Sequence, residues 1–194
     1  MPEPTRILII GDSISIGYTP FVAEMLAGHG RIGHNPGNGG DSRNVRANLD
    51  AWLAESPAEI VHVNCGLHDI KVAFDSDARQ VPLAEYRDNL SWIADRLSAC
   101  DAAPIWAATT PVVEAWHHQR KAFDRFNADV DAYNAAAAEI MGGAGIAVND
   151  LHAVIQAAGP EKLLSPDGVH FSEAGYRLLA EKVVECLRTV LDAG

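Results

Sequence analysis

The sequence of 194 residues has few cysteines, few basic residues and no long apolar run. Its three cysteines are odd in number, widely spaced and set in apolar segments, which favours buried free thiols over a disulfide framework or a metal-thiolate motif. No apolar run approaches the roughly 18 residues of a membrane span, and no leader-like segment precedes the first predicted strand. We therefore expect a soluble, cytoplasmic protein without a membrane partner, unless a leader has been removed.

Basic residues are outnumbered: 15 Lys and Arg stand against 26 Asp and Glu, a formal charge of −11. Such a chain repels phosphate backbones unless it carries a local basic patch. The densest basic run, residues 117–121, is short and is soon followed by Asp124. This run is typical of a solvated helix start, so we expect no nucleic-acid partner.

The remaining composition is that of an ordinary globular protein, with 48% hydrophobic and 21% charged residues. A chain of this length can bury one good core, and a second full domain would be crowded. No internal repeat, low-complexity tract or linker interrupts it. We predict one domain over residues 1–194, with an oligomeric state that the sequence leaves open.

Short β-branched runs alternate with helical stripes along the chain. The runs predict buried strands at residues 6–10, 31–34, 60–64, 104–109 and 146–148. Apolar spacings of three and four predict helices at 19–28, around 45–53, at 82–97, at 122–141 with Gly142 and Gly143 as C-cap, and after Ser172. This alternation predicts a five-stranded parallel sheet covered by helices on both faces.

In such sheets ligands bind beyond the carboxyl ends of the strands, so chemistry is sought in the loops there. Serine-dependent acyl transfer needs a hydroxyl, a histidine that takes its proton, and usually a carboxylate that orients the histidine. Across a Pro/Gly turn, Asp167 can reach the imidazole of His170. On its own, the pair of Asp167 and His170 is equally typical of a turn. Ser13 on its own is typical of a serine that stabilises a turn by hydrogen bonding.

A glycine-rich loop at residues 36–42 can turn backbone N–H groups toward a concavity. On its own it is typical of a flexible turn. The glycine spacings of phosphate-binding loops are absent, so nucleotide binding receives little support.

Together, four loops resemble the SGNH (GDSL-type) hydrolase family over nearly the whole chain. They are Gly-Asp-Ser at 11–13, the loop 35–42 ending in Gly-Asp-Ser, Gly-x-His-Asp at 66–69, and Asp-Gly-Val-His at 167–170. The resemblance implies a flavodoxin-like α/β/α sandwich. It also implies a triad in which Ser13 is the nucleophile, Asp167 the orienting acid and His170 the base, with the N–H groups of Ser13 and Gly40 in the oxyanion hole.

One motif departs from the family pattern, since His68 stands where the family has asparagine. A side-chain amide donates an N–H at every accessible pH, whereas a neutral imidazole donates from one nitrogen only. We expect His68 to be a third oxyanion donor, the alternative being a residue that braces the loop. Asp69 is expected to be structural.

The other histidines do not predict a metal site. The spacing of His29, His34, His62 and His152 is unlike that of metal ligands. We expect His117 and His118 to lie on the surface at a helix start, the alternative being a substrate rim. No metal and no cofactor are predicted.

These residues predict metal-independent hydrolysis of a carboxylic ester through an acyl-serine intermediate. The expected substrate is an ester in which a small acyl group such as acetyl is attached to a carbohydrate or another small molecule. Two alternatives stay open. One is an acyltransferase of the same fold. The other is a noncatalytic ligand-binding module, which remains an alternative because His68 departs from the family pattern.

Overall fold

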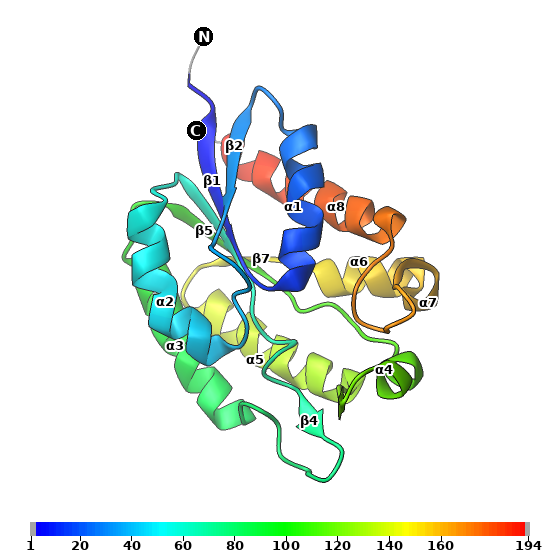
Figure 1. Cartoon of the computed structure of the whole chain (residues 1–194). Helices are drawn as coiled ribbons and strands as arrows, with labels where there is room; N and C mark the ends of the chain where they lie inside the picture. The colour runs from blue at the N-terminus through cyan, green and yellow to red at the C-terminus, as the bar shows by residue number, and fades with distance from the viewer. Residues whose placement is uncertain (1–2, 193–194) are drawn as a thin grey trace.

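Five apolar runs form the central parallel sheet of the computed structural model, which describes residues 3–192 (Figure 1). The strands are β1 (Thr5–Ile10), β2 (Gly30–His34), β3 (Ile60–Val63), β5 (Ala103–Ala107) and β7 (Ala147–Asn149), in the order β2-β1-β3-β5-β7. Every neighbouring pair is parallel. This is the flavodoxin-like strand order, so the predicted fold class is confirmed.

Helices cover both faces of the sheet (Figure 1). One layer holds α2 (Ser42–Glu55), α3 (Leu83–Ser98) and α5 (Asn127–Gly143), and the other holds α1 (Ser13–Met25), α6 (Leu151–Ala158) and α8 (Glu173–Leu191). Two short helices, α4 (Glu114–Arg120) and α7 (Pro160–Leu163), and the antiparallel pair of β4 (Val72–Ala73) and β6 (Phe123–Asp124) complete the described elements. The result is a three-layer α/β/α sandwich.

The core lies between the sheet and each helical layer. Residues 7–10 of β1 are buried, as expected for a strand covered on both faces. In α3 the buried side chains include Leu90, Ile93 and Leu97, the apolar stripe that the sequence predicts. No helix within the described residues is long and apolar enough to cross a membrane.

The first helix begins at Ser13, so the predicted start at Thr19 was wrong. Asp12 caps α1, because its carboxylate accepts a hydrogen bond from the Ile14 amide at 2.9 Å. Pro20 therefore lies inside the helix and not in its first turn. A proline there removes one backbone bond, but the packing of α1 against α8 stabilises the helix despite this loss.

Two further details differ from the prediction. The helix expected from Ala122 begins at Asn127, because residues 123–124 form β6 and the Glu114 carboxylate accepts the Asn127 amide at 2.7 Å. Its two final glycines lie within α5, whose C-cap is Ala144. All three cysteines are free as predicted, although Cys65 alone is buried.

Candidate active site

Ser13 is the first residue of α1 and follows the carboxyl end of β1. In the sheet, β1 lies between β2 and β3, so the strand order reverses at this point. The Gly11 amide donates to Asn35 Oδ1 at 2.9 Å, which ties this turn to the loop after β2. A Cβ at Gly11 would lie 2.7 Å from Ser15 Oγ, so a larger residue would clash. Ser13 thus stands at the switch point of the sheet, on a helix N-terminus whose dipole favours negative charge.

The loop before α8 holds Asp167 by three hydrogen bonds to one oxygen. Its Oδ1 accepts from the Ser165 hydroxyl at 2.8 Å and from the amides of Val169 and His170 at 3.1 and 2.9 Å. Gly168 has φ of +72°, a conformation that favours glycine. The turn therefore fixes the carboxylate beside the histidine that follows it.

Ser13, His170 and Asp167 form one hydrogen-bonded chain. His170 Nδ1 lies 2.6 Å from Asp167 Oδ2, and His170 Nε2 lies 2.9 Å from Ser13 Oγ. Burial favours a raised pKa for Asp167, but hydrogen bonds from His170, Lys121 and Ser165 outweigh it and hold that pKa well below its usual range. The anionic carboxylate favours the proton on Nδ1, which leaves the Nε2 lone pair free to accept the serine proton.

Lys121 contacts the same carboxylate and was missed by sequence reasoning. Its Nζ lies 2.9 Å from Asp167 Oδ2, the oxygen that also faces His170. The sequence placed Lys121 in a solvated helix start, whereas the residue caps the C-terminus of α4. No local pattern links it to Asp167, which lies far along the chain.

His68 carries a defined tautomer. Its Nδ1 lies 3.0 Å from Lys71 Nζ, and an ammonium group can only donate, so Nδ1 is the acceptor and the proton resides on Nε2. Burial, together with the charges of Lys71 and Arg125, lowers the pKa of His68 to about 4. The ring is thus a neutral Nε2–H donor that lines the cavity at Ser13. Its Nε2 lies 3.9 Å from Asp12 Oδ2.

The glycine-rich loop packs against the serine turn. The Gly39 amide donates to the Gly11 carbonyl at 2.8 Å, and Gly40 has φ of +66°. The Gly40 amide, however, already donates to Asn38 Oδ1 at 2.9 Å. This N–H can therefore serve a substrate oxygen only after the Asn38 side chain gives way.

The expected surface position of His117 was wrong. Its side chain is fully buried, and Nε2 accepts from Arg125 Nη1 at 2.9 Å. Burial, followed by the charges of Arg125 and Lys121, lowers the pKa of His117 to about 4. His118 is exposed, as predicted, and lies 2.8 Å from Asp124.

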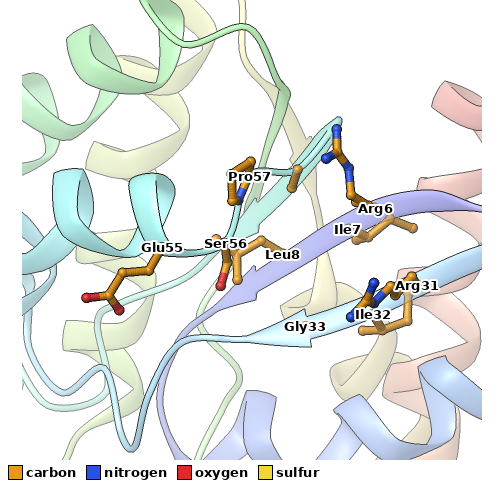
Figure 2. Close-up of a pocket in the computed structure, with 10 residues that line it drawn as sticks. Arg6, Ile7, Leu8, Arg31, Ile32, Gly33, Glu55, Ser56 and Pro57 are labelled. Atoms are coloured by element: carbon orange, nitrogen blue, oxygen red, sulfur yellow. The ribbon is translucent and has the colours of Figure 1, made fainter.

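A cavity of about 260 Å³ opens at the triad, and Ser13, His170 and His68 line it. A second cavity, of about 270 Å³, lies beside β1, β2 and the segment before β3 (Figure 2). There Arg6 and Arg31 stand on neighbouring strands, and Arg6 is held by Glu59 at 2.9 Å. This second cavity has no histidine in its lining, so the chemistry of acyl transfer gathers in the first.

Within residues 3–192, no three histidine, cysteine, aspartate or glutamate side chains gather in a way that could hold a metal ion.

Comparison with solved structures supports the fold. The chain is similar to a lipase/acylhydrolase from Enterococcus faecalis (20% identity, TM-score 0.79, 96% of each chain covered). It is also similar to an acetylxylan esterase from Geobacillus stearothermophilus (19%, 0.76, 93% of each chain) and to an alpha/beta hydrolase enzyme from the metagenome of Lake Arreo, Spain (19%, 0.77, 95% of each chain). No match was found among the curated proteins.

The family comparison is more specific than these distant likenesses. The model of the GDSL-like lipase/acylhydrolase family matches residues 9–178, a stretch that includes all four loops described above. The chain therefore belongs to the GDSL-like lipase/acylhydrolase family and is a serine ester hydrolase.

Proposed function

We propose that Ser13, His170 and Asp167 form the catalytic triad of this hydrolase. The observation that carries the proposal is the unbroken chain from Ser13 Oγ through His170 to Asp167 Oδ2, with distances of 2.9 and 2.6 Å. Ser13 Oγ attacks the ester carbonyl while its proton passes to His170 Nε2. The alcohol then leaves with that proton, and water, activated by His170, hydrolyses the acyl-serine.

The negative charge that develops on the carbonyl oxygen needs donors that are already in place. We assign this role to the Ser13 amide at the start of α1 and to the neutral His68 Nε2–H. The Gly40 amide joins them once Asn38 Oδ1 is displaced by the substrate oxygen. The tautomer set by Lys71 supports His68 as the group that takes the place of the family's asparagine.

The proposed substrates are short-chain esters, acetyl esters in particular, of a carbohydrate or another small molecule. A cavity of about 260 Å³ is small for a ligand site and accommodates a short acyl group together with part of the alcohol. Several solved structures of this fold are acetylxylan esterases, which supports the same direction. We propose hydrolysis, with no cofactor and no metal, in preference to acyl transfer to another alcohol.

A fluorophosphonate probe tests the nucleophile directly. The expected result is labelling of Ser13, mapped by mass spectrometry, with no labelling of Ser13→Ala and full labelling of the control Ser91→Ala, whose serine lies exposed on α3. Hydrolysis of 4-nitrophenyl esters of increasing chain length and of acetylated saccharides then defines the substrate. Labelling of another residue overturns the triad, and faster transfer to an added alcohol than to water overturns hydrolysis.

A further inference from the structure

Arg125 is a buried cation that lacks an anionic partner. Its residue exposure is 5%, and its hydrogen bonds go to the Leu67 carbonyl through Nε and to His117 Nε2 through Nη1. Neither acceptor carries a negative charge: one is a backbone carbonyl, and the other is an imidazole that is neutral because burial lowers the pKa of His117 to about 4. Among residues 3–192, Arg125 makes no ion pair within 4.0 Å. A buried charge without a counterion is costly, so the site is built to receive one.

Lys71 repeats this arrangement against the ring of Phe123, which Arg125 also contacts. Its Nζ lies 5.1 Å from the centre of the Phe123 ring, and the Arg125 guanidinium lies 5.0 Å from the same centre. The hydrogen bond of Lys71 goes to the neutral His68, and within the described part of the chain this lysine also lacks a carboxylate partner. Two cations therefore lie near one aromatic ring in the wall of the catalytic cavity.

The other charged groups described near the cavity form no ion pair with these two cations, although the charges of Asp12 and Asp167 act on Arg125 from beyond 4.0 Å. Lys121 also lines the cavity and is paired with Asp167. Asp12 is the one carboxylate among the lining residues, and it caps α1 through the Ile14 amide. Three cations therefore line the cavity beside a single carboxylate. Burial lowers the pKa of Arg125 to about 10, so this guanidinium is still charged at neutral pH.

We propose that the cavity selects esters that carry a carboxylate group near the ester bond, and that Arg125 and Lys71 bind this carboxylate. The inference rests on the proposed function of the Ser13 cavity and adds a substrate class to it. Arg125 keeps Nη2 and Lys71 keeps two N–H groups beyond the bonds described, and a planar guanidinium matches a carboxylate. A net charge of −11 disfavours anionic polymers, but a small anion enters a cationic cavity.

Matched pairs of substrates test this selectivity. The first pair, 3-acetoxybenzoate and 3-acetoxybenzamide, places the charge on the alcohol side. The second pair, monomethyl succinate and methyl butyrate, places it on the acyl side. We expect kcat/KM to be higher for the anionic member of at least one pair, and this ratio to fall about tenfold or more in Arg125→Gln, as for loss of a charge-assisted hydrogen bond.

Three further variants give the comparison its controls. Lys71→Gln keeps a donor toward His68 but loses the charge, so it too is expected to lower the ratio, and it replaces Arg125→Gln if that variant does not fold. Arg125→Lys retains the charge and should retain most of the preference. Arg96→Gln removes a cation that is paired with Asp50 on the outer helices and should leave the ratio unchanged.

Calorimetry on the Ser13→Ala protein separates this inference from the triad. We expect 3-hydroxybenzoate to bind more tightly than 3-hydroxybenzamide, and Arg125→Gln in the same background to abolish the difference. Equal kcat/KM for the two members of both substrate pairs, or an unchanged substrate ratio in Arg125→Gln and Lys71→Gln, overturns the inference and leaves Arg125 as a brace of the Leu67 carbonyl. A binding preference together with full esterase activity of Ser13→Ala would retain the carboxylate site and overturn the triad instead.

Discussion

Lys121 Nζ lies 2.9 Å from Asp167 Oδ2, the oxygen that also lies 2.6 Å from His170 Nδ1. The lysine therefore withdraws part of the carboxylate's negative charge from the imidazole. In Lys121→Gln the whole charge acts on His170 and holds a proton on it more firmly. We predict that the acidic limb of kcat/KM against pH moves to higher pH by on the order of half a unit. Lys121→Arg should leave the profile in place; identical profiles for all three proteins would show that the lysine only braces the loop.

Ser13→Ala tests the nucleophile by rate. Loss of a triad member removes several orders of magnitude of kcat, while the small change at the start of α1 should leave the melting temperature within a few degrees of wild type. Steady-state hydrolysis of 4-nitrophenyl acetate and a thermal melt give the two quantities. Residual kcat above about a tenth of wild type would exclude Ser13 as the nucleophile.

Much of this site could be predicted because its parts are local. Asp167 and His170 share one turn, Ser13 follows a strand that the β-branched residues mark plainly, and parallel strands end at one edge of the sheet. Most of the strands could be predicted for the same reason: β1, β3 and β5 are apolar runs whose residues are largely buried, whereas the edge strands β2 and β7 are more exposed. These are properties that a few consecutive residues carry by themselves.

The parts that the sequence did not predict depend on distant contacts. Lys121 and Arg125 come from the segment between α4 and α5, and their positions follow from the packing of that segment against loops far along the chain. His117 looked solvated in a basic run, yet its ring is buried against Arg125. The start of α1 was misplaced because Thr-Pro resembles a helix start, whereas the cap that Asp12 provides begins the helix earlier.

The buried His62 gives a prediction for stability against pH. His62 belongs to β3, and its Nε2 accepts a hydrogen bond from Asn149 Nδ2 at 3.1 Å. Burial lowers the pKa of His62 to about 4. Between pH 6.5 and 4 the unfolded chain binds a proton at this residue and the native state does not, so the free energy of unfolding falls as the pH falls. The slope should exceed that of His62→Gln by up to about 1.4 kcal/mol per pH unit in urea titrations. Parallel slopes for the two proteins would contradict the shift.

His68 should affect the transition state more than the bound substrate. If Nε2–H donates to the oxyanion, the bond strengthens as charge develops, so its loss lowers kcat more than it raises KM. We predict a loss on the order of a hundredfold in kcat for His68→Ala and partial recovery in His68→Asn, whose amide donates from a similar position. Should both variants fold and keep wild-type kcat, the imidazole is a brace and the oxyanion depends on backbone amides.

The Asn38 side chain should restrain the same step, because its Oδ1 occupies the Gly40 amide at 2.9 Å. A substrate oxygen must displace this acceptor before Gly40 can stabilise the oxyanion. In Asn38→Ala the amide is free from the outset, and no described non-glycine residue has a positive φ that alanine would strain. We predict that the rate constant of acylation, measured in the pre-steady state, rises about two- to tenfold, which corresponds to one neutral hydrogen bond. Asn38→Asp, which keeps the acceptor and adds a negative charge beside the developing oxyanion, should lower the rate instead. A fall in rate for Asn38→Ala would mean that Asn38 itself orients the substrate, and that the Gly40 amide has no part in catalysis.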